Sequence, residues 1–165
     1  MVFVIEAIVL CLVFTVADIV PLMLGKNPLD WVYDQPEKII NHCYELGLIH
    51  SKEKIKDKRT IIKKLIGALF ILIVFSLIIR YINKETTFLK GFMISYGLWF
   101  IVDWFDCIFI DWIFVCNTGL YVIKGTEDIK DAYKDYAFHA TGSLKGMIAG
   151  IPVCLIAGLI VSILP

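Results

Sequence analysis

The sequence predicts an all-α, polytopic membrane protein with four transmembrane helices and two cytoplasmic amphipathic helices that lie along the membrane interface. Of its 165 residues, 59% are hydrophobic, and the mean hydropathy is +0.78. Both values exceed those of an ordinary soluble domain of this size. Four windows are long enough to cross a bilayer core, which requires about 20 mainly apolar residues per helix. We therefore expect a single integral membrane domain over residues 1–165.

The four predicted spans differ in the charges that they carry. They cover about residues 2–24, 61–82, 91–116 and 146–165. The first span contains Glu6 and Asp18, whereas the fourth has no charged residue. Before Pro21 there is neither a basic region nor a small-residue cleavage pattern. We therefore expect the first span to stay as an anchor rather than to be removed as a signal peptide.

Lysine and arginine are concentrated in the two long connections, 25–60 and 117–145, and at the span ends that adjoin them. The hairpin between the second and third spans has fewer. Because cytoplasmic loops are enriched in these residues, we expect a cell-membrane protein with both termini outside and both long connections in the cytoplasm. The long connections hold Lys26, Lys38, Lys52, Lys54, Lys56, Lys58, Arg59, Lys63 and Lys64, then Lys124, Lys130, Lys134 and Lys145, and the hairpin holds Arg80, Lys84 and Lys90.

Each long connection contains a segment with the pattern of an amphipathic helix. The segment 34–47 starts with an aspartate cap candidate and an early proline, and it ends with a glycine. In the second segment we expect Thr126 to cap a helix from Glu127 to about His139. Both helices would turn an apolar stripe toward the membrane. The stripes are Ile39, Ile40, Cys43 and Leu46 in the first helix, and Ile129, Tyr133, Tyr136 and Ala140 in the second.

The third span is unusual because it contains Asp103, Asp106 and Asp111 within a strongly apolar stretch. Near the centre of a membrane helix each aspartate costs about 2.5–3.5 kcal/mol, while each good apolar residue returns only about 0.3–0.6 kcal/mol. On an α-helix the three aspartates fall within an arc of roughly 140°, together with Tyr96 and Trp99. We therefore expect one acidic side that faces other helices, water, a cation or protons instead of lipid.

Two roles remain open for this acidic side. The aspartates could form a protonatable or cation-holding cluster in a polar cavity, in which at least one carboxyl would have a raised pKa. Alternatively, they could hydrogen-bond to neighbouring polar groups and only fix the helix packing. Glu6 and Asp18 of the first span are the expected partners and would extend the acidic groups across much of the bilayer; in the simpler interpretation they mark the two ends of an ordinary span.

The fourth span carries a stripe of small residues that recur every four positions. Such a stripe allows another helix to approach closely. The sequence leaves open whether that helix belongs to the same chain or to a second copy, so a homo-oligomer formed through the stripe is one expectation. The stripe consists of Gly142, Gly146, Gly150, Cys154 and Gly158.

The motif Asp-x-x-x-x-Asp-Trp at 106–112, followed by Lys-Asp-Tyr-x-Phe-His at 134–139, resembles a group of small bacterial multi-pass membrane proteins. The resemblance covers about residues 98–146 and implies a membrane fold but no established activity. Within the motif, Tyr136 and His139 are three residues apart and share one helix face. They would reach the cytoplasmic end of the third span, near Asp111 and Asn117, where a histidine could relay protons or bind a metal. The alternative is that His139 is an ordinary interfacial residue.

Other site classes find little support in the sequence. The five cysteines form no C-x-x-C pair, and we interpret them as small buried residues. His42 and His50 have no zinc-ligand spacing, so no metal site is predicted, and no cofactor can be named. The basic run 51–64 is expected to meet lipid headgroups and not nucleic acid, because it adjoins the membrane and lacks a recognised module.

Three functions fit these features. The first is a small proton- or cation-coupled transporter or channel that uses the intramembrane aspartates. The second is a non-catalytic membrane partner or assembly subunit. The third is a membrane enzyme that acts on a lipid-borne substrate at the cytoplasmic face, although no known nucleophile, zinc or phosphate-loop motif supports it.

Overall fold

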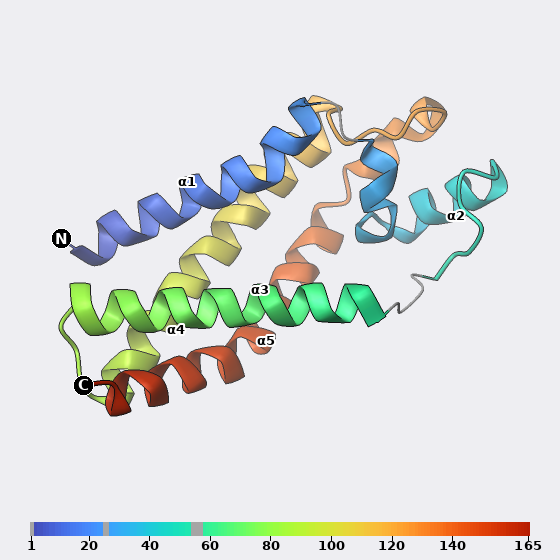
Figure 1. Ribbon diagram of the computed structural model, residues 1–165. Coiled ribbons are helices and arrows are strands. Elements are labelled where there is room, and N and C mark those ends of the chain that lie inside the picture. The colour runs from blue at the N-terminus through green and yellow to red at the C-terminus, as the bar shows by residue number, and fades with distance from the viewer. Residues whose placement is uncertain (1, 25–26, 54–57) are drawn as a thin grey trace. The chain divides into compact units, whose positions relative to one another are not determined.

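The computed structural model describes residues 2–24, 27–53 and 58–165, and this part of the chain is helical without any strand. Figure 1 shows long α-helices linked by shorter elements. Two of these, η1 and η4, are 3₁₀-helices, and two, η2 and η3, are π-helical. In chain order the elements are α1 (Val2–Met23), η1 (Pro28–Asp34), α2 (Glu37–Glu45), α3 (Lys58–Leu77), η2 (Ile78–Ile82), α4 (Phe88–Phe105), η3 (Asp106–Thr118), η4 (Glu127–Tyr133) and α5 (Tyr136–Ile163).

Within the described residues, three helical stretches are long and apolar enough to cross a membrane. They are Val2–Val20, Leu65–Ile82 and Tyr136–Ile163. Large apolar side chains on them are exposed, among them Leu12, Leu69 and Ile148, as expected for helices that face lipid. The predicted third span, 91–116, is helical throughout, but its crossing of the membrane stays a prediction. Lys26, Lys54 and Lys56, which contribute to the predicted orientation, lie outside the described residues.

The chain forms two compact units. Unit 1 consists of Met1–Cys11, Lys56–Trp104 and Leu144–Pro165, and unit 2 consists of Leu12–Ile55 and Phe105–Ser143. Each unit has its own hydrophobic core, so the two are described separately.

The core of unit 1 depends on a close contact between α4 and the glycines of α5. A side chain at Gly150 would lie 2.5 Å from Trp99 Nε1, and one at Gly158 would lie 2.8 Å from the backbone of α4. Ser95 also lies 3.4 Å from the carbonyl of Cys154. The two helices therefore run antiparallel at backbone contact, with small residues of α5 facing α4. The surrounding core contains Ala7, Phe75, Ile79, Leu98, Cys154, Ala157 and Val161.

The stripe of small residues thus has a partner within the same chain. Gly146 contacts Asp103 of α4, whereas Gly142 has nothing within 4 Å of the position of a Cβ atom. The predicted homo-oligomer through this stripe stays a prediction, and Gly142 is the part of the stripe with open space beside it.

The core of unit 2 joins η1, α2 and η4. Ile39 and Cys43 of α2 are fully buried against Val32, Ile123 and Tyr133. α2 ends at Glu45, and the glycine expected at the end of this segment, Gly47, follows two residues later with a positive φ. The apolar side of α2 packs in part against protein, so the expectation that this side faces the membrane was wrong for Ile39 and Cys43. The predicted aspartate cap was also wrong, because Pro36 occupies the N-cap position.

The segment 127–139 also differs from the prediction. It is not one helix but a 3₁₀-helix, η4, followed by a break and the start of α5 at Tyr136. Thr126 makes no side-chain cap; its hydroxyl donates to the carbonyl of Ile123 instead. The Asp135 carboxylate accepts the N–H of Phe138 at 2.9 Å and so begins α5 about ten residues before the predicted fourth span. Tyr133 was expected to face the membrane, but it is 1% exposed and lies in the protein core.

The π-helical winding of η3 changes the expected arrangement of the aspartates. The sequence analysis assumed α-helical periodicity over the whole third span, and this assumption was wrong beyond Phe105. In a π-helix the backbone bonds join residues five apart, which turns Asp106 and Asp111 toward the same side. Asp106 and Asp111 are five residues apart, which is also the separation of hydrogen-bonded residues in a π-helix.

The glycine contacts generate a testable pair of substitutions on α5. We expect Gly158→Ala to destabilise the protein by about 1–3 kcal/mol, because its Cβ would press against the α4 backbone. Gly142→Ala should be neutral or stabilising by up to about 1 kcal/mol, since its Cβ meets open space and alanine favours a helix. Thermal unfolding of both variants in detergent measures the difference. Equal stability of the two variants would contradict the backbone contact.

Candidate functional site

The candidate site lies in unit 2, where the imidazole of His139 in α5 contacts the carboxyl group of Asp111 in η3. The Nδ1 atom of His139 lies 3.1 Å from Oδ2 of Asp111. The carboxylate can only accept, so Nδ1 carries the hydrogen in this contact. His139 is 5% exposed, and its second nitrogen, Nε2, is buried without a hydrogen-bond partner among the described residues. The pair therefore joins a buried imidazole to a partly exposed carboxyl group, with one ring nitrogen of the imidazole still available.

Three further side chains surround the same helix ends. The Tyr136 hydroxyl and the Asn117 side chain exchange hydrogen bonds at 3.2 and 3.4 Å. Trp112 donates to the Tyr136 carbonyl at 3.3 Å and packs edge-on against its ring. From the sequence, Tyr136 and His139 were expected near Asp111 and Asn117. In the structure, Tyr136 bonds to Asn117 and His139 contacts Asp111.

Asp18 of α1 belongs to unit 2 and is held by Tyr121, whose hydroxyl donates to Oδ2. Burial raises the pKa of Tyr121, and the hydrogen bond to Asp18 and the charges of Asp106 and Asp111 raise it further. The carboxyl groups of Asp18, Asp106 and Asp111 therefore all raise the pKa of the same hydroxyl. Nothing in the sequence marks Tyr121 as a partner of Asp18, because it lies 103 positions after Asp18 and outside every predicted span.

The remaining predicted residues belong to unit 1. The Asp103 carboxylate lies against Gly146, with Oδ1 2.5 Å from the position of a Cβ atom there. Trp99 donates to the Gly146 carbonyl at 3.2 Å, and Tyr96 stacks on Phe92 beside the core. Trp99 and Tyr96 are thus packing residues of the α4–α5 contact.

Glu6 of α1 accepts a hydrogen bond from Asn83 Nδ2 at 2.9 Å. Asn83 follows η2 in the hairpin between α3 and α4, and the sequence analysis did not select it. The predicted path of carboxyl groups from Glu6 to Asp18 stays a prediction, because Glu6 and Asp18 belong to different units.

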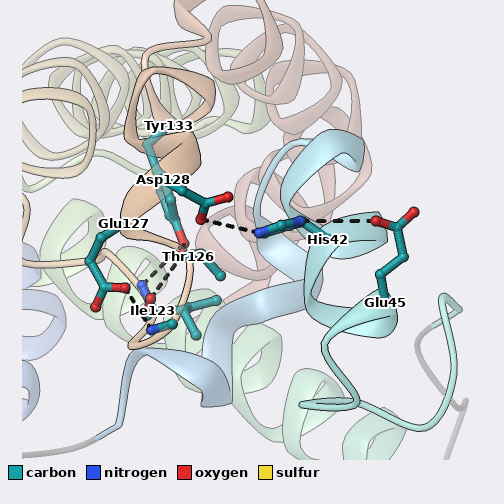
Figure 2. A network of polar contacts seen from close by, with 8 residues as sticks. His42, Glu45, Ile123, Thr126, Glu127, Asp128 and Tyr133 are labelled. Carbon is teal, nitrogen blue, oxygen red and sulfur yellow. Dashed lines mark hydrogen bonds and ion pairs between the residues drawn. The ribbon is translucent and has the colours of Figure 1, made fainter.

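A second polar network in unit 2 ties α2 to η4, as Figure 2 shows. His42 Nε2 lies 3.2 Å from Asp128 Oδ1, and His42 Nδ1 lies 4.0 Å from Glu45 Oε2. Beside it, the Tyr133 hydroxyl accepts the N–H of Ile123 at 3.0 Å and contacts the Thr126 hydroxyl at 2.8 Å (Figure 2). His42 is partly open to solvent, so this network joins two elements and is not a buried site.

The described residues contain no group of three or more His, Cys, Asp or Glu side chains placed to hold a metal ion. All five cysteines are buried. No family model, curated protein or solved structure matches the chain. The chemistry of the site must therefore be inferred from its own geometry.

Tyr133 gives a prediction for high pH. Burial raises its pKa in the folded protein, whereas an unfolded tyrosine titrates near about pH 10. The stabilisation by the neutral hydroxyl is therefore complete below about pH 10 and decreases as the pH rises above this value. Tyr133→Phe should lower the free energy of unfolding at neutral pH by about 1–3 kcal/mol, because Ile123 loses its buried acceptor.

Unfolding curves from pH 7 to 11 measure both effects. The loss of stability at alkaline pH should be smaller in Tyr133→Phe than in the wild type. Tyr44→Phe is the matched control, because Tyr44 is exposed in the same unit. If Tyr133→Phe and Tyr44→Phe behave alike, the Tyr133 hydroxyl does not hold this core together.

Proposed function

We propose that this chain is a multi-pass membrane protein that moves protons, or cations coupled to protons, and that the Asp111–His139 pair holds the proton. The observation that carries this proposal is the buried Nε2 atom of His139, which has no partner among the described residues while Nδ1 is paired with Asp111. An imidazole whose Nδ1 is paired can accept a proton at Nε2 and release it again. Asp111 would compensate the positive charge while the proton is bound.

The neighbouring polar groups support the same function. Asp18 and Asp106 lie close enough to Tyr121 to raise the pKa of its hydroxyl. Proton movement needs such a series of groups that can donate and accept. The three apolar helices are compatible with a membrane location. In the proposed topology the third span is a fourth crossing with its aspartates inside the membrane, and both termini lie outside. The long connections then place the Asp111–His139 pair toward the cytoplasm.

Proton flux into liposomes tests the proposal. The purified protein is reconstituted with a pH-sensitive dye inside, and a potassium gradient with valinomycin drives proton entry. We expect Asp111→Asn and His139→Gln each to reduce the flux at least tenfold, because either change removes one half of the proton-holding pair. The double variant should lose little more than either single variant, because the two residues act as one unit.

Asp131→Asn is the matched control. Asp131 is an exposed aspartate of η4 that pairs with Lys134 at 2.9 Å, so its loss removes one carboxylate without touching the pair. Its flux should equal that of the wild type. Wild-type flux in Asp111→Asn would reject the assignment of the pair, and wild-type liposomes that take up protons no faster than empty ones would reject transport altogether.

A membrane enzyme that acts on a lipid-borne substrate is the second candidate, and the same pair favours it. A carboxylate that orients an imidazole, with the other ring nitrogen free, is the arrangement of a general base. Incubation with defined lipid vesicles, followed by mass spectrometry of the lipids, distinguishes this function. Conversion of a lipid by the wild type and its loss in His139→Gln would favour the enzyme over the transporter.

A further inference from the structure

Unit 1 contains an apolar groove between α1 and η2 that is separate from the Asp111–His139 pair. Its volume is about 290 Å³, near the lower end of the range for small-molecule sites. Its exposed wall is apolar, and one of its lining residues, Glu6, is acidic. The lining residues are Val2, Ile5, Glu6, Val9, Leu10, Ile78 and Ile82.

The Glu6 carboxylate is only half satisfied by the protein. The residue is 8% exposed, and Oε1 accepts the Asn83 amide. The second oxygen, Oε2, is buried and has no hydrogen-bond partner among the described residues. A buried carboxylate oxygen without a donor is unfavourable, because it has lost its hydration without replacement.

Two cations from the segments around the groove have partners other than Glu6. Arg80 of η2 donates to the Pro165 carbonyl at 3.1 Å, and Lys90 pairs with Glu85 at 3.0 Å. Within the described part of unit 1, neither side chain makes a contact with Glu6. The Glu6 carboxyl group therefore lies in apolar surroundings beneath the groove wall, and no ion pair joins it to a cation of the described residues.

The π-helical turn η2 builds one wall of the groove. The N–H of Asn83 bonds to the Ile78 carbonyl five residues earlier, as expected for π winding. This turn places Ile78 and Ile82 on the groove and Asn83 beside Glu6. Single π-turns within helices occur frequently at functional sites.

We propose that this groove binds a small amine with an apolar body, whose ammonium group donates to Glu6 Oε2. The apolar part would lie against the isoleucine and valine side chains, and the ammonium would supply both the missing donor and the missing positive charge. The carboxylate lies beneath the apolar wall, so a rotation of the flexible glutamate side chain must accompany binding. The proposal does not depend on proton transport, since it uses other residues in another unit.

The binding of 4-phenylbutylamine to the full chain in zwitterionic nanodiscs tests the proposal, with the heat from empty nanodiscs subtracted in a calorimetric titration. The comparison ligand is 4-phenylbutanol, which has the same apolar body without the charge. We expect the wild type to bind the amine at least tenfold more tightly than the alcohol. Glu6→Gln should lose this preference, and its affinity for the amine should decrease at least tenfold.

Two further variants separate the role of Glu6 from a general loss of charge and from misfolding. Glu85→Gln removes another carboxylate from the same hairpin, one that is already paired with Lys90, and should bind the amine like the wild type. Ile82→Trp leaves Glu6 intact but fills the groove, so it should weaken binding of the amine and of the alcohol alike. Ile82 is exposed, so this variant folds even if Glu6→Gln does not.

The proposal is overturned if the wild type binds amine and alcohol equally, or if folded Glu6→Gln keeps the affinity of the wild type. It is also overturned if Ile82→Trp leaves binding of the amine unchanged. Asp111→Asn should bind the amine normally, so a failure of the transport proposal and a failure of the amine site give different results.

Discussion

The close contact between α4 and α5 is the constraint on which unit 1 depends. Residues meet in a regular antiparallel register, in which Asp103 faces Gly146, Trp99 faces Gly150 and Gly91 faces Gly158. At these positions any side chain larger than hydrogen would meet an indole ring, a carboxylate or the backbone itself. Because lipid offers little hydrophobic driving force for helix association, such van der Waals contact is a main source of stability between membrane helices. The same contact fixes where the first aspartate of the third span can lie.

The second constraint is that a carboxylate within an apolar helix needs a hydrogen-bond donor. In both units a side chain from another segment supplies that donor. Glu6 receives an amide hydrogen bond from Asn83, Asp18 receives a hydroxyl from Tyr121, and Asp111 receives the imidazole of His139. In each case the donor comes from a segment distant in the sequence, so each contact also joins two elements. An acidic side chain that would oppose membrane insertion by about 2.5–3.5 kcal/mol on its own becomes a specific connection once its donor is in place.

Some of this could be read from the sequence, and the rest could not, for physical reasons. Long apolar stretches predict long helices, and the three-residue spacing of Tyr136 and His139 was enough to expect both beside the end of the third span. The π winding of η3 was missed, because apolar periodicity assumes 3.6 residues per turn and the five-residue spacing of Asp106 and Asp111 does not by itself exclude an α-helix. Tyr121 was missed because only the folded chain brings it to Asp18. The early start of α5 was signalled by Asp135, a good cap residue that was overlooked in favour of Thr126.

Glu6 Oε2 and His139 Nε2, which are among the buried side-chain atoms without a hydrogen-bond partner in the described residues, differ in what they can accept. The imidazole nitrogen completes its bonding with a single proton, and Asp111 already compensates the charge that results. The glutamate oxygen has only a neutral amide beside it, so a donor that brings its own positive charge satisfies it best. A fold selected for stability alone would pair or remove both atoms, since each costs about 1–3 kcal/mol when left unsatisfied. Their retention is best explained if something from outside the chain, a proton in one unit and an ammonium group in the other, completes them in turn.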